Sequence, residues 1–126
     1  MPQNPNELSP LTLAFVGDGV YSLLVRERLA QTNRPAGELH RLSVKQVNAR
    51  AQAGAAAFLE ERLTEKEKSI LKRGRNAHVG TVPKSVSVGE YHAATGLEAL
   101  FGYLYLCGQA ERMRELFRMI CENAAY

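Results

Sequence analysis

Two acidic residues stand out in this chain of 126 residues because their surroundings are unusual for a carboxylate. Asp18 lies between Gly17 and Gly19, in a stretch whose apolar residues recur at helical spacing. A glycine inside a helix costs roughly 1 kcal/mol relative to alanine, so two glycines beside one aspartate need a reason. The helical period turns Asp18 away from Val16 and Val20, and small neighbours would let a metal ion or a phosphate approach. A helix crossing that needs glycine, with Asp18 merely solvated, explains the same pattern.

Glu98 is the only charged residue in the segment from Gly96 to Cys107, which is apolar on almost every side. Such a helix should be largely buried, and a buried carboxylate is costly unless a cation or hydrogen bonds compensate for it. Carboxylate oxygens are the hard ligands that Mg²⁺ prefers. We therefore predict that Asp18 and Glu98 are metal ligands and catalytic residues for Mg²⁺, with Mn²⁺ as a substitute. A salt bridge from Glu98 to an arginine is the structural alternative, and Gly102 would allow the close approach of another helix.

The segment from Lys68 to Gly89 contains five cations and no acidic residue. Cationic side chains beside a flexible glycine and an amide can follow a phosphate backbone. A solvated basic loop is the alternative reading. The residues expected to contact the polyanion are Lys72, Arg73, Arg75, Asn76 and Lys84.

Composition narrows the class of protein without identifying it. Hydrophobic residues make up 45% of the chain, which is typical of a folded protein, and the net charge of +3 permits a polyanionic partner without demonstrating one. Cys107 and Cys121 lack metal-ligand spacing and are expected to be reduced core thiols in a reducing cytoplasm. No secretion signal or membrane-length apolar run is recognisable. No phosphate-binding glycine loop or nucleophile motif is recognisable either, so nucleophilic catalysis is not favoured.

The elements that must position these residues are expected to be helices, giving an all-α fold. The sequence predicts a flexible start over residues 1–8, followed by a single domain over residues 9–126. Ser9 and Pro10 are typical of a helix start, and Thr64 with Glu67 forms a capping-box pattern. The predicted helices are 10–31, 37–59 with a kink or division at Gly54, 65–73 ended by Gly74, 90–107, and 109–124 after Gly108.

Three segments, in order, resemble the ribonuclease III family in the form of its Mini-III branch. Leu13–Tyr21 is similar to the family's signature motif, Lys72–Ala77 to the basic motif of the branch, and Thr95–Tyr105 to its second acidic segment. The resemblance covers roughly residues 9–124. It implies the all-α ribonuclease III-type endonuclease domain as a homodimeric helical bundle, with one acidic cluster per subunit and no double-stranded-RNA-binding domain.

The resemblance also implies a function. The expected activity is Mg²⁺-dependent endonucleolytic cleavage of double-stranded RNA, leaving 5′-phosphate and 3′-hydroxyl ends, in the maturation of large-subunit (23S) ribosomal RNA in the cytoplasm. Classical members of the family have four carboxylates per site, and the two other positions are occupied here by Ala14 and Thr95. We therefore expect weak metal binding without RNA, whose phosphate would supply missing ligands.

Three other classes of protein compete with this interpretation. A non-catalytic RNA-binding or ribosome-assembly module on the same fold would not need both carboxylates. A helical Mg²⁺-dependent nucleotide pyrophosphohydrolase would resemble others through Glu-x-x-Glu pairs, and this chain has none. A plain dimerisation protein leaves the Gly17-Asp18-Gly19 cost unexplained. The apolar residues Phe101, Tyr103 and Leu104 are expected to supply part of the dimer interface.

Overall fold

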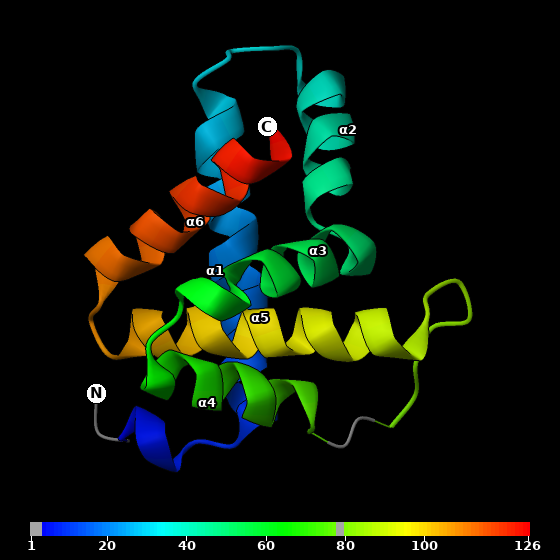
Figure 1. Cartoon of the computed structure of the whole chain (residues 1–126). Coiled ribbons are helices and arrows are strands. Elements are labelled where there is room, and N and C mark those ends of the chain that lie inside the picture. The colour runs from blue at the N-terminus through cyan, green and yellow to red at the C-terminus, as the bar shows by residue number, and fades with distance from the viewer. Residues whose placement is uncertain (1–3, 78–79) are drawn as a thin grey trace.

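The structure, a computed structural model, describes residues 4–77 and 80–126. Within these residues the chain is entirely helical, with no β-strand, so the all-α prediction is confirmed (Figure 1). Short 3-10 helices cover Pro5–Glu7 (η1) and Glu60–Arg62 (η2). The α-helices are α1 (Pro10–Ala30), α2 (Ala36–Gln46), α3 (Ala49–Leu59), α4 (Glu65–Arg75), α5 (Val88–Leu106) and α6 (Ala110–Ala124).

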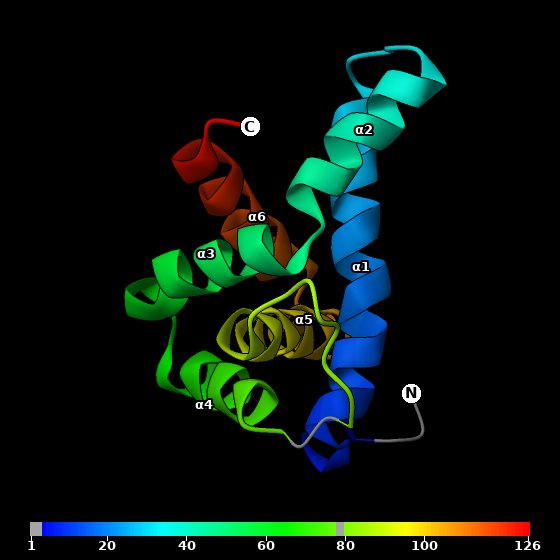
Figure 2. The same ribbon diagram turned by 90° about the vertical axis from the view of Figure 1, so that its right-hand side faces the viewer.

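Helix α5 is the centre of the fold. It runs between α3 and α4 and is crossed by α1 at a steep angle, and Figure 2 shows it end-on with these helices around it. This placement explains why its sequence is apolar on almost every side, since each side faces a neighbouring helix. The side chains with no exposed surface include Leu97, Leu100, Phe101 and Leu104.

The burial of α5 corrects the predicted dimer interface. Phe101 and Leu104 have no exposed surface, and Tyr103 is buried with its hydroxyl donating a hydrogen bond to Asn6 Oδ1 at 3.0 Å. Phe101 packs edge-on against Tyr21, with ring centroids 5.1 Å apart. These side chains therefore fill the core of one chain and are not available to a second copy.

The second predicted helix is in fact two helices. The sequence predicts a division at Gly54, but α2 ends at Gln46 and α3 begins at Ala49. Asn48 causes the break, because its side-chain oxygen accepts a hydrogen bond from the backbone of Ala51 at 2.9 Å and so caps the start of α3. Gly54 lies inside α3 with no other group close to it.

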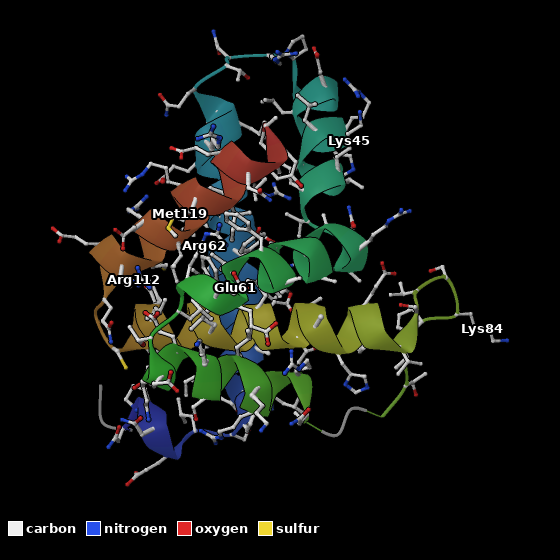
Figure 3. The ribbon with its side chains drawn as sticks, in the orientation of Figure 1. Lys45, Glu61, Arg62, Lys84, Arg112 and Met119 are labelled. Atoms are coloured by element: carbon white, nitrogen blue, oxygen red, sulfur yellow. The ribbon has the colours of Figure 1, made fainter. Side chains whose placement is uncertain are left out.

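Helix α4 begins with the predicted capping box. Thr64 Oγ1 accepts from the backbone of Glu67 at 3.2 Å, and the Glu67 side chain accepts from the backbone of Thr64 at 2.9 Å. The buried Glu67 carboxylate also accepts two hydrogen bonds from Arg112 of α6, at 2.8 and 2.9 Å (Figure 3). The Arg112 guanidinium lowers the pKa of Glu67, so this pair stays ionised and ties α4 to α6.

The ends of the other helices agree with their sequence signals. Ser9 caps α1 with Pro10 as its first residue, and the turn between α5 and α6 places Gly108 at a φ of 73°. Helix α5 begins at Val88, two residues before the predicted start. At the start of the described chain, for which the sequence predicts flexibility, Asn4 caps η1. Within the described residues, no helix combines the length and apolar character needed to cross a membrane.

Candidate active site

The position of α1 on α5 is set by two glycines in direct contact. A Cβ atom added to Gly17 would collide with the backbone carbonyl of Glu98 and lie 2.9 Å from the backbone nitrogen of Gly102. A Cβ atom on Gly102 would in turn collide with the carbonyl of Leu13. Gly17 and Gly102 therefore let the two backbones touch, as the sequence predicts for Gly102. Gly19 is different, because a Cβ atom there would meet nothing within 4 Å.

This crossing brings Asp18 and Glu98 together, as the metal-site prediction requires. Asp18 is exposed on α1, and Glu98 is partly buried on α5. Burial, and next the negative charge of Asp18, raise the pKa of Glu98 from its usual 4.5 to about 8. A carboxylate pair in which one charge suppresses the other is a site where a divalent cation would be stabilising, because the cation relieves the repulsion.

A third polar side chain, which the sequence analysis missed, reaches the same place from α3. Gln52 is 4% exposed, and its amide acts on Glu98 by lowering the pKa of that carboxyl group. Its Nε2 atom nevertheless makes no hydrogen bond of standard geometry. The signal was present in the sequence, because Gln52 is the one polar member of a buried stripe that continues through Ala55, Ala56 and Leu59 at helical spacing.

The two positions where classical relatives would carry further carboxylates are closed to solvent. Ala14 and Thr95 are both buried, and the Thr95 hydroxyl donates to the backbone carbonyl of Tyr91 at 3.0 Å. Across residues 4–77 and 80–126, no group of three or more aspartate, glutamate, histidine or cysteine side chains is placed to hold a metal. The candidate site therefore has two carboxylates, one exposed edge beside Gly19 and one buried amide. Its hard oxygen donors fit Mg²⁺ with several ligands left to water or phosphate.

The predicted basic residues are divided between a helix and a loop. Lys72, Arg73 and Arg75 lie on the last turn of α4, and Asn76 is the C-cap of that helix. Gly74 does not end α4 as predicted but packs against α5, where an added Cβ atom would lie 2.8 Å from the Cα atom of Gly96. The glycine contact thus packs the cationic turn of α4 directly against α5 at Gly96.

The cations of this turn differ in their partners. Arg75 forms an exposed ion pair with Glu60 at 3.4 Å, whereas Lys72 and Arg73 are exposed and have no ion-pair partner among the described residues. Lys84 lies on the connection between α4 and α5 and points away from the helices (Figure 3). The structure therefore groups three of the predicted cations beside the site and sets Lys84 apart from them.

The helical fold, with two carboxylates brought together where helices cross, is that of a known nuclease family, as comparison with known proteins shows. Residues 11–109 match the family model described as the ribonuclease III domain. A crystal structure of a Fusobacterium nucleatum protein superposes with a TM-score of 0.87 and 31% sequence identity, covering 94% of this chain and 95% of that one. The chain belongs to the ribonuclease III family and is an endoribonuclease.

The branch of the family follows from the curated relatives. A Mini-ribonuclease 3 from Thermoanaerobacter sp. (strain X514) is 50% identical over 113 residues, which are 89% of this chain and 80% of that protein. A Mini-ribonuclease 3 from Symbiobacterium thermophilum is 48% identical over 116 residues, which are 91% of this chain and 89% of that protein. The resemblance to the Mini-III branch is thereby confirmed.

Proposed function

We propose that this endoribonuclease cleaves double-stranded RNA in a Mg²⁺-dependent reaction at Asp18 and Glu98. The observation that carries the proposal is the pairing of these carboxylates where α1 crosses α5, with one exposed and one partly buried. The fold brings them together through a backbone contact at Gly17 rather than through an ion pair. The cationic turn of α4 supports the choice of a polyanionic substrate.

The roles of the residues follow from their exposure. Exposed Asp18 and partly buried Glu98 would hold Mg²⁺, which when bound supplies an activated water and neutralises charge on the scissile phosphate. Asp18 faces solvent beside Gly19, where there is room for a phosphate to approach. Glu98 is partly buried, and its raised pKa means that it would bind the cation as a carboxylate after losing its proton. With two carboxylates, weak metal binding is expected until the RNA phosphate completes the ligand set.

The RNA backbone would be bound by the three cations of the α4 turn, which are Lys72, Arg73 and Arg75. Asn76 would reach a sugar or base edge, and Lys84 would contact phosphate further along the duplex. A-form RNA is read mainly by its shape and its 2′-hydroxyl groups, so we expect little sequence specificity from this domain alone. A precursor of large-subunit (23S) ribosomal RNA in the cytoplasm is the proposed substrate. The proposed products carry 5′-phosphate and 3′-hydroxyl ends.

The active form is proposed to be a homodimer, which would place two sites on one duplex. Helix α1 carries Phe15 with 82% of its surface exposed, and Leu11, one turn earlier, is also exposed. Both lie on the same side of the helix as Asp18 at helical spacing. An exposed phenylalanine beside a functional residue is typical of a surface that a partner covers, which supports this face of α1 in place of the buried α5 residues.

The proposed function is tested by incubating the purified protein with a long RNA duplex, with Mg²⁺ and with EDTA. We expect cleavage only with Mg²⁺, and a loss of about 10²-fold or more in rate for Asp18→Asn and for Glu98→Gln. Ligation of the products without prior kinase treatment would show 5′-phosphate ends. Duplex binding without cleavage under any metal condition would favour the RNA-binding module instead, and normal rates in both variants would exclude this site.

A further inference from the structure

A buried amide on α3 has no role in the proposed function. Gln52 lies on α3, which packs along α5, and its side chain is 4% exposed among alanines. Its Nε2 atom is buried without a hydrogen-bond partner. Leaving a buried amide donor unsatisfied costs on the order of 1–3 kcal/mol. An alanine or leucine at this position would avoid that cost, so the amide needs an explanation.

The carboxylate of Glu98, on the helix against which α3 packs, is close enough for Gln52 to lower its pKa. Of the side chains near Glu98, Gln52 is the one that favours its ionised form, while burial and Asp18 oppose it. Gly17 of α1 contacts the backbone of Glu98, and α3 packs along the same helix, so Glu98 lies where α1, α3 and α5 meet. A carboxylate held in this way can direct one oxygen to the amide and leave the other oxygen free.

We propose that Gln52 is a positioning residue for Glu98, with its Nε2 atom donating a hydrogen bond to one carboxylate oxygen so that the other oxygen faces the metal. The inference rests on the proposed assignment of Glu98 as a metal ligand. It gives the buried amide a partner, and it compensates in part for the small number of carboxylates. Hydrogen bonds from outside the ligand set orient metal ligands, and their loss typically lowers metal affinity 10- to 100-fold.

The first test compares Gln52→Met with Gln46→Met by direct titration of Mn²⁺ in the absence of RNA. Methionine keeps the length of the side chain but removes the donor. Gln46 is a matched control because it is also buried, with an unpartnered Oε1 atom, but lies on α2 in a pocket lined by Leu29 and Tyr126. We expect Gln52→Met to weaken Mn²⁺ binding on the order of 10-fold and Gln46→Met to leave it unchanged.

Equal Mn²⁺ affinity in Gln52→Met and the wild-type protein would overturn the inference, as would equal weakening in both glutamine variants. Glu98→Gln serves as the reference for the site itself. If Glu98→Gln binds Mn²⁺ like the wild type, the metal site is misassigned. If Glu98→Gln loses Mn²⁺ binding and Gln52→Met does not, the site stands and the role of Gln52 is wrong.

A second measurement uses the unaltered protein and does not depend on the folding of a glutamine variant. The side-chain amide signal of Gln52 in a ¹⁵N-correlated NMR spectrum should shift when Mg²⁺ is added, because its acceptor becomes a metal ligand. The same signal should be insensitive to Mg²⁺ in Glu98→Gln, and the Gln46 amide should be insensitive in both proteins. A Gln52 signal that Mg²⁺ leaves unmoved in the wild-type protein would contradict the proposal.

Discussion

At the scale of single residues, the candidate site depends on how the surroundings of one carboxylate differ from those of the other. Asp18 faces solvent, whereas Glu98 is partly buried and lies against Asp18, which together with burial raises the pKa of Glu98 to about 8. Without a metal, Glu98 is therefore protonated over much of the neutral range. The folded chain then favours the neutral form of a group that is ionised in the unfolded chain.

This difference predicts a pH dependence of stability. Below pH 4.5 Glu98 is protonated in both states, and between about 4.5 and 8 only the unfolded chain releases the proton, so stability falls as pH rises. Between pH 5.5 and 8.5 the wild-type protein should lose on the order of 3 kcal/mol of stability through this group, and Glu98→Gln should remove that loss. Urea unfolding in EDTA at pH 5.5 and 8.5 measures it. Parallel pH dependences in the two proteins would contradict the prediction, and Mg²⁺ should restore stability to the wild type alone.

At the scale of helices, glycines do more to build the site than any charged group does. Gly17 and Gly102 put the backbones of α1 and α5 in contact, and Gly74 with Gly96 does the same for α4 and α5. These contacts leave no space that a side chain could occupy. The placement of the carboxylates and of the cationic turn therefore depends on backbone approach at two crossings.

The glycines of the α1 motif should accordingly respond in opposite ways to alanine. Gly17→Ala should cost about 3 kcal/mol or more, because its Cβ atom would collide with the carbonyl of Glu98. Gly19→Ala is the control, with open space around the added atom and a gain of up to about 1 kcal/mol from helix propensity. Urea unfolding of both variants checks this. A Gly17→Ala protein as stable as the wild type would show that the crossing tolerates a side chain.

The last turn of α4 carries a separate prediction about RNA. The double variant Arg73→Ala with Arg75→Ala should bind the duplex more weakly. The slope of log Kd against log salt should fall by about 1–2, because a protein with fewer phosphate contacts releases fewer counterions when it binds. Fluorescence anisotropy with a labelled duplex in EDTA measures binding without cleavage. Arg28→Ala with Arg118→Ala is the matched control, since these arginines line a groove between α1 and α6. Equal slopes in the two double variants would remove the α4 turn from the binding surface.

Particular residues show why the sequence predicts some of this architecture and not the rest. Asp18 and Glu98 were identifiable because glycines beside one, and an apolar helix around the other, carry costs that need a purpose. Gln52 is difficult to identify from the sequence because its alanine neighbours make a weak hydrophobic stripe, although a polar residue in that stripe is a usable signal. The break before α3 is difficult to predict because it depends on a local hydrogen bond: the Asn48 side chain caps α3, which competes with continuation of the preceding helix.

At the scale of the whole molecule, composition does not show which apolar residues are buried in the core and which are exposed on the surface. The apolar side chains of α5 are largely buried within one chain, and the most exposed large apolar residue in the described part of the chain is Phe15 on α1. The proposed association of two chains would therefore use the face of α1 that includes Asp18, and not the segment with the highest hydrophobicity.

Charge on that face should prevent association. Phe15→Lys is expected to shift the protein from dimer to monomer in sedimentation velocity at micromolar concentration, because a lysine would be buried without a partner. Val88→Lys is the control, since Val88 is also exposed but lies at the start of α5. A dimeric Phe15→Lys protein would place the interface elsewhere, and a monomeric wild-type protein would exclude the homodimer.

One chain supplies all three polar side chains of the candidate site, from α1, α3 and α5. With the proposed assignment, the chemistry of breaking one strand would be complete within a single subunit, and association would contribute only the second cut. A mixed dimer of wild-type and Asp18→Asn chains should then nick duplex RNA in one strand and leave the other intact. One chain would then be enough to cut a single strand, whereas two chains would be needed to cut both strands.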